Sequence, residues 1–192
     1  MDQHIEIEFK NLLDKREFVQ LIDHFKIDAS GFTSQLNHYF DTSGFELKTR
    51  SSALRIRAKN ERFELTLKQP ASEGLLETNQ AITDEEATAF LKHGTFPKGV
   101  ILRLLTEEGF DTDAFTCFGT LETNRFEFSY KEGLLVLDHS SYLDQEDYEL
   151  EYEVTDAKAG KNIFLSLLES LHIPERKTEN KVKRFYRAKF KD

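Results

Sequence analysis

Alternation of apolar and charged residues over strand-length segments constrains the fold of this chain more than any other feature. In HIEIEFK (4–10), Ile5, Ile7 and Phe9 alternate with polar and charged residues. A period of two puts successive side chains on opposite faces of a β-strand. Strands are also predicted over 33–41, 52–59, 62–69, 75–82, 118–130, 133–143 and 147–154. The sequence therefore predicts about eight strands, mostly antiparallel because their connections are short.

Amphipathic helices are predicted between and after these strands. Residues 14–25 space their apolar side chains as one helix face, with Asp14 as a suitable N-cap. Residues 83–93 begin with a T-x-x-E pattern, which is typical of a capping box. Further helices are predicted over 98–109, 157–171 and 178–190. The expected fold class is α+β, mainly antiparallel β, with residues 1–192 forming a single domain.

Composition excludes several classes of protein. Hydrophobic residues make up 39% of the 192 residues and include 17 Phe, which argues against general disorder. The formal charge of −9 argues against a nucleic-acid partner. Cys117 is the only cysteine, so an internal disulfide and a thiolate zinc cluster are excluded. Without a visible secretory signal or a long apolar run, we expect a cytoplasmic protein with no membrane partner.

The charged residues are segregated by strand. Carboxylates dominate two segments and cations a third: Glu6 and Glu8; Glu149, Glu151 and Glu153; Arg55, Arg57 and Lys59. Alternation alone is common on the wet face of an antiparallel sheet and indicates no function. Here, however, the amphipathic helices can cover the apolar faces, and in a curled sheet the charged faces then line an interior. Segregation by sign therefore predicts a site with an acidic wall and a basic wall.

These two walls suit different partners. Carboxylates without His or Cys are typical ligands of hard cations such as Mg²⁺ or Mn²⁺. Arginine and lysine bind phosphate oxygens, arginine through a bidentate fork and lysine as a point charge. A complex of a metal ion with a polyphosphate presents both kinds of partner. The residues alone thus predict the class of ligand.

An ordered set of motifs resembles a known family. HIEIEFK contains E-x-E-x-K, and it is followed by ALRIRA, ELTLKQP, Arg125, LLVLD, ELEYE and NKVKRFY. This order resembles the CYTH superfamily, or triphosphate tunnel metalloenzymes, and in particular small bacterial members related to thiamine triphosphatase and class IV adenylyl cyclase. The resemblance implies a closed eight-stranded β-barrel tunnel with helices packed outside. It also implies hydrolysis or cyclisation of triphosphates with Mg²⁺ or Mn²⁺.

The resemblance also implies roles for individual residues. Metal ligands would be Glu6, Glu8, Glu77, Asp138, Glu149 and Glu151. Substrate-binding residues would be Lys10, Arg55, Arg57, Lys68, Arg125, Lys181 and Arg184. Glu6, Glu8 and Lys10 would be catalytic. Glu153 could lie either in the metal site or beyond it, at the strand end. Two positions depart from the family pattern R-x-E-x-E, since Leu75 replaces the arginine and Asn79 the second glutamate.

The leading hypothesis is a metal-dependent triphosphatase acting on inorganic tripolyphosphate, thiamine triphosphate or a nucleoside triphosphate, as a monomer or homodimer. One alternative is an adenylate cyclase that makes cyclic AMP from ATP. Another is a polyphosphate- or nucleotide-binding module with little turnover. In the C-terminal helix, Lys181 and Arg184 are one turn apart, so both can face the tunnel while Lys183 and Arg187 face water.

Overall fold

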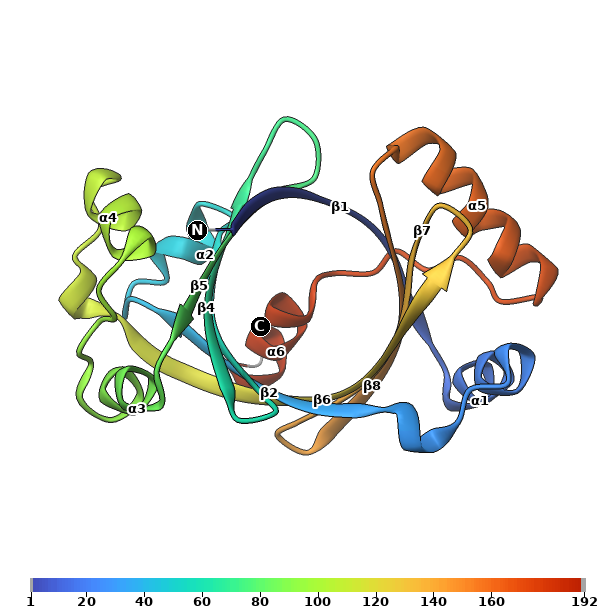
Figure 1. The fold of residues 1–192 in the computed structure, drawn as a ribbon, viewed down its shortest axis with the longest axis horizontal. Coiled ribbons are helices and arrows are strands. Elements are labelled where there is room, and N and C mark those ends of the chain that lie inside the picture. The colour runs from blue at the N-terminus through green and yellow to red at the C-terminus, as the bar shows by residue number, and fades with distance from the viewer. Residues whose placement is uncertain (1, 191–192) are drawn as a thin grey trace. The chain divides into compact units, whose positions relative to one another are not determined.

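Eight antiparallel strands form a closed barrel in the order β1-β5-β4-β3-β2-β6-β7-β8 in the computed structural model, which describes residues 2–190 (Figure 1). The strands are β1 (Asp2–Leu13), β2 (Thr33–Asp41), β3 (Ala53–Lys59), β4 (Arg62–Pro70), β5 (Leu75–Ile82), β6 (Thr116–Tyr130), β7 (Gly133–Tyr142) and β8 (Gln145–Val154). The helices are α1 (Lys15–Phe25), α2 (Glu46–Thr49), α3 (Asp84–His93), α4 (Val100–Glu107), α5 (Ala157–Ser170) and α6 (Lys181–Phe190). Single 3-10 turns cover Ala29–Gly31 and Thr112–Ala114. The predicted fold class and eight-stranded barrel are confirmed.

Local capping explains where two of the helices begin. The Asp14 carboxylate accepts a hydrogen bond from the Glu17 amide, and the Glu17 carboxylate accepts one from the Asp14 amide. Thr83 and Glu86 form the same reciprocal capping box at the start of α3. Each box satisfies two backbone donors that have no partner inside the helix. Both predicted N-caps are confirmed.

Contacts divide the described chain into two compact units. The first unit comprises residues 2–5 and 35–121, and the second comprises residues 6–34 and 122–190. Each unit has its own apolar core, built from one face of its strands and the helices that cover that face. The prediction that residues 1–192 form a single domain stays a prediction.

The core of the first unit lies between strands β3 to β5 and helices α3 and α4. Ile56, Leu65 and Leu67 are fully buried against Phe90 of α3 and Ile101 of α4. Figure 1 shows α3 and α4 beside β4 and β5. Burying a side chain of this size stabilises the fold by roughly 1.5–3 kcal/mol. This packing turns the apolar face of the strands toward the helices and leaves the charged face on the other side.

The core of the second unit follows the same rule. Leu137, Leu150 and Tyr152 from β7 and β8 pack against Leu21 of α1 and Phe164 of α5. Because side chains alternate along β8, Glu149 and Glu151 lie on the face opposite this core. The helix α6 differs from α1 and α5, since its cations contact the carboxylates of that polar face.

The short helix α2 was not predicted. Its four residues are too few to show a helical period. It is held instead by the buried Asp41, whose carboxylate accepts hydrogen bonds from the amides of Thr42, Leu47 and Lys48. A cap that reaches seven residues along the chain has no local sequence pattern.

Candidate functional site

The polar face of β8 carries four carboxylates in single file. Along the strand these carboxylates alternate with apolar residues that face the second unit's core. The four carboxylates belong to Asp147, Glu149, Glu151 and Glu153. Antiparallel pairing puts Glu149 opposite Asp138 of β7 and Glu151 opposite Lys10 of β1. Residues that pair directly point to the same face of a sheet. The strand period and the register therefore bring these acidic side chains together.

One group of three carboxylates lies at the β1–β8 pairing and is called the acidic cluster here: Glu6, Glu8 and Glu153. One carboxylate oxygen from each lies within 4.8 Å of the other two. Glu8 and Glu153 are direct partners in the strand register. The Lys10 ammonium contacts a Glu8 oxygen at 2.5 Å. Burial and the neighbouring charge of Glu6, acting against Arg125, raise the pKa of Glu153 to about 7.

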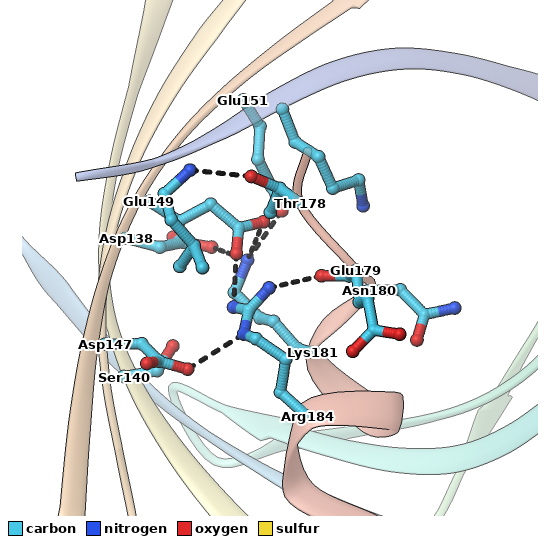
Figure 2. Close-up of polar contacts among 12 residues, drawn as sticks. Asp138, Ser140, Asp147, Glu149, Glu151, Thr178, Glu179, Asn180, Lys181 and Arg184 are labelled. Atoms are coloured by element: carbon cyan, nitrogen blue, oxygen red, sulfur yellow. Dashed lines mark hydrogen bonds and ion pairs between the residues drawn. The ribbon is translucent and has the colours of Figure 1, made fainter. Parts of the chain in front are cut away.

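A second group, the cation-bound carboxylates, comprises Asp138, Glu149 and Glu151. Arg125 binds both oxygens of Asp138, at 2.8 and 2.7 Å, and reaches Glu151 at 2.8 Å. The Lys181 ammonium lies 2.8 Å from Asp138, 3.1 Å from Glu149 and 2.5 Å from Glu151. Figure 2 shows Lys181 reaching from α6 toward the three carboxylates. The chain's own cations thus compensate this buried negative charge.

Electrostatics within this group favour ionised Asp138 and Glu151. Burial acts to raise both pKa values, but Lys181 and Arg125 outweigh it and lower them. The same carboxylates raise the pKa of Lys181 well above its ordinary value, despite its burial. Burial together with the adjacent charge of Glu151 raises the pKa of Glu149 to about 7, against the effect of Lys181 and Arg184. Glu149 is therefore the member of this group that takes up a proton most readily.

Arg184, one turn after Lys181, binds the same strand. Its Nε donates to Asp147 at 2.9 Å, and a terminal nitrogen contacts Glu149. The other terminal nitrogen donates to the Glu179 carbonyl (Figure 2). Lys183 and Arg187 are more than half exposed and pair with the Glu179 carboxylate. Lys181 and Arg184 thus contact carboxylates of the sheet, whereas Lys183 and Arg187 lie on the exposed side of α6. Their spacing in the sequence predicted these two sides of the helix.

The first unit carries a separate basic group on β3 and β4: Arg55, Arg57 and Lys68. Strand pairing places Arg55 opposite Thr66, and Lys68 opposite Glu77 of β5. The Arg57 Nε donates to the Asn37 amide oxygen at 3.4 Å. The Arg55 Nε is buried and has no hydrogen-bond partner. A guanidinium with an unsatisfied donor of this kind suits an anionic ligand.

Glu77 is the only predicted metal ligand in the first unit. Lys68 contacts its carboxylate at 2.7 Å, and the Asn79 amide donates to it at 3.0 Å. The Thr66 hydroxyl in turn donates to the Asn79 oxygen at 2.8 Å. Although burial acts to raise it, Lys68 and Arg55 lower the pKa of Glu77 to about 2. Asn79, which departs from the expected R-x-E-x-E pattern, supplies a neutral donor that adds to the effect of these cations.

The predicted site residues fall into these groups as follows. The second unit holds Glu6, Glu8, Lys10, Arg125, Asp138, Glu149, Glu151, Lys181 and Arg184, and the first unit holds Arg55, Arg57, Lys68 and Glu77. Glu153, which sequence reasoning left open, is grouped with Glu6 and Glu8. Asp147 was not predicted, although it shares the period-two spacing of the other β8 carboxylates. The period-two spacing along this strand was the sequence pattern that could have identified both Asp147 and Glu153.

No helix within residues 2–190 is long and apolar enough to cross a membrane.

Comparisons with known proteins found a family model and a relative that match nearly the whole chain. The model of the CYTH domain family matches residues 4–186. The chain is 47% identical over 191 residues to the Bacillus subtilis (strain 168) protein named "Putative triphosphatase YjbK", a match that covers 100% of this chain and 99% of the relative.

Two solved structures share the fold. A Bacillus halodurans protein described as a "putative adenylate cyclase" is 45% identical with a TM-score of 0.93, covering 97% of this chain and 100% of that one. HpAC1 from Hippeastrum is 27% identical with a TM-score of 0.80 and 96% coverage of both chains. That protein is described as a "putative adenylyl cyclase" with a dominant triphosphatase activity.

Proposed function

Because the chain belongs to the CYTH domain family, we propose that it is a metal-dependent triphosphatase. Its substrate would be inorganic tripolyphosphate, thiamine triphosphate or a nucleoside triphosphate, whose common part is the triphosphate group. The names of two relatives support hydrolysis, since one is named "Putative triphosphatase YjbK" and the other is described as having a dominant triphosphatase activity.

The acidic cluster is the observation that carries this proposal. Glu6, Glu8 and Glu153 bring three carboxylate oxygens within 4.8 Å of one another, in the same unit as the cations of β1, β6 and α6. Three adjacent carboxylates repel one another unless a proton or a cation compensates them. Burial and this repulsion together raise the pKa of Glu153.

The donor atoms of the acidic cluster fit a hard divalent cation. All three ligands are carboxylate oxygens, as Mg²⁺ and Mn²⁺ prefer, and none is a thiolate or an imidazole. Glu6, Glu8 and Glu153 would hold the ion. When bound, it would neutralise phosphate oxygens and lower the pKa of a coordinated water. The metal roles expected for Asp138, Glu149, Glu151 and Glu77 remain proposals, and in all four cases cations of the chain already contact the carboxylates.

The cations would bind and orient the triphosphate. Lys10, Arg125, Lys181 and Arg184 in the second unit, and Arg55, Arg57 and Lys68 in the first, are the residues proposed for this role. Charge accumulates on the transferred phosphoryl group and on the leaving oxygen during hydrolysis, and fixed cations stabilise it. Lys181 and Arg184 now bind carboxylates, so phosphate oxygens would have to compete with Glu149 and Glu151 for them.

Substitution of the acidic cluster tests the proposal. Glu6→Gln and Glu8→Gln should abolish Mg²⁺- or Mn²⁺-dependent release of phosphate from tripolyphosphate, thiamine triphosphate and ATP. Glu169→Gln, on an exposed position of α5, is the matched control and should behave as wild type. Full activity in the two cluster variants would contradict the assignment. Tight metal-dependent binding without product from any of the three substrates would instead favour a binding module.

Cyclisation of ATP is the second candidate, and it rests on the description of the Bacillus halodurans structure. Separation of the products made from ATP distinguishes the two reactions. Hydrolysis of the terminal phosphate yields ADP and orthophosphate, whereas cyclisation yields cyclic AMP and pyrophosphate. We propose a cytoplasmic monomer or homodimer, which sedimentation and cell fractionation would test.

A further inference from the structure

Arg184 is held by more than the carboxylate of Glu149. Its Nε donates to Asp147 at 2.9 Å, one terminal nitrogen donates to the Glu179 carbonyl, and the other contacts Glu149. The side chain is only 10% exposed. A guanidinium has five N–H donors in a rigid planar fork. Three donors are therefore engaged by the chain, and their three acceptors define the plane and direction of the two that remain.

Asp147 is itself fixed by a buried tyrosine. The Tyr142 hydroxyl donates to the same Asp147 oxygen that accepts from Arg184, at 2.6 Å. Tyr142 is 5% exposed, and its ring lies 5.6 Å from the ring of Phe185, the residue that follows Arg184 in α6. Tyr142 and Asp147 belong to β7 and β8, next to the turn that joins them. This turn thus supports α6 through one hydrogen-bonded chain and one aromatic contact.

The two α6 cations contact successive carboxylates along β8. Lys181 and Arg184 are separated by about 4.5 Å along the helix axis, and alternate residues of β8 lie roughly 6.8 Å apart. Arg184 spans Asp147 and Glu149, whereas Lys181 spans Glu149 and Glu151. The carboxylate of Asp147 is the only one of the three that contacts Arg184 without also contacting Lys181, among the contacts of the described residues.

We propose that Asp147 is a positioning residue that orients the Arg184 guanidinium for a triphosphate oxygen, and that Tyr142 holds Asp147 in place. This inference rests on the proposed function, in which Arg184 binds the substrate. A ligand oxygen would meet a guanidinium whose plane is already set, so that little rotamer entropy is lost on binding. Asp147 touches neither substrate nor metal in this role and acts through Arg184 alone.

A purely electrostatic role predicts different behaviour. If Asp147 only reduced the positive charge of Arg184, removal of its charge would tighten the binding of an anion. Asp147→Asn and Asp147→Ala would then have the same effect. In a positioning role the asparagine oxygen can still accept from Nε, and only the alanine variant loses the acceptor. The two substitutions therefore separate charge from orientation.

The test compares these variants in binding and turnover of tripolyphosphate. Asp147→Ala should lower kcat/KM about tenfold and weaken binding by a similar factor, as expected for a lost hydrogen bond to a charged group. Asp147→Asn should restore most of the loss, and Tyr142→Phe should show a smaller loss. In an Arg184→Met background, Asp147→Ala should have no further effect. Asp144→Ala, exposed in the same turn, is the matched control.

Each outcome supports or overturns the inference. Equal losses from Asp147→Ala with and without Arg184 would overturn it, because Asp147 would then act independently of that residue. Equal effects of the Ala and Asn variants would also overturn it. If the variants give either of these results while the wild-type protein turns over tripolyphosphate, only this inference is overturned and the proposed function stands. Wild-type protein that neither binds nor hydrolyses tripolyphosphate, thiamine triphosphate or ATP would overturn both proposals.

Discussion

The Lys181 ammonium lies 2.5 Å from a Glu151 oxygen, although the two residues are 30 positions apart and belong to α6 and β8. The same ammonium also contacts Asp138 and Glu149. It is therefore the shared counterion of three almost fully buried carboxylates. A lysine in this position links the docking of α6 to the charge state of the polar face.

Loss of this counterion should destabilise the protein. Lys181→Met leaves three buried carboxylates with less compensation, and we expect the free energy of unfolding to fall by about 3 kcal/mol. Urea denaturation in metal-free buffer measures this decrease in the free energy of unfolding. Lys183→Met removes a lysine from the exposed side of α6 and should cost no more than about 0.5 kcal/mol. Similar losses in the two variants would contradict a shared counterion.

Metal affinity should depend on pH through Glu153. Because burial and the charges around it raise its pKa to about 7, Glu153 carries a proton below that pH and must release it to bind a cation. Mg²⁺ affinity should therefore increase as pH rises from 6 to 8. Calorimetry in two buffers of different ionisation enthalpy would measure the released proton. Glu153→Gln should bind more weakly and reduce that release, and an unchanged proton count would show that another group titrates.

Glu77 should make stability depend on acidity. Its pKa is lowered from 4.5 to about 2, so between these values the unfolded chain binds more protons than the folded one. The stabilisation is complete above about pH 4.5 and is lost as pH falls toward 2. After discounting for solvent screening it is on the order of 2 kcal/mol.

Denaturation of Glu77→Gln at several pH values measures this contribution. The variant should differ from wild type at pH 6 and converge with it near pH 2.5. Glu107→Gln, with its side chain 65% exposed, should follow wild type throughout. A constant difference between Glu77→Gln and wild type would assign the effect to packing instead of ionisation.

Asn79 should be required as a neutral donor to Glu77. Asn79→Asp keeps the acceptor for the Thr66 hydroxyl but replaces the donor with a second carboxylate, 9% exposed and beside Glu77. We expect a loss of about 2 kcal/mol at pH 7 that shrinks at acidic pH, as one carboxyl becomes protonated. Thermal unfolding at pH 5 and pH 7 checks this. Asn162→Asp, exposed on α5, should change little, and equal shifts for both variants would refute the role.

Local patterns were enough to predict most elements. The strands at 33–41 and 75–82 have the predicted bounds, and α1 begins directly after the predicted N-cap Asp14. These features depend on neighbours within four residues, which a single sequence displays. The short helix α2 escaped prediction because its support comes from Asp41, outside any local repeat.

The polar face of each strand could be assigned from the amino-acid sequence alone, because the two-residue period is a local property of the backbone. The grouping of the acidic residues, in contrast, depends on the tertiary structure. Asp138, Glu149 and Glu151 contact cations of β6 and α6, whereas Glu6, Glu8 and Glu153 lie together as the acidic cluster, where Lys10 of β1 contacts Glu8. That division depends on strand register and on the docking of α6. Both arise from contacts between residues far apart in the chain. The spacing of residues along the sequence does not predict such contacts.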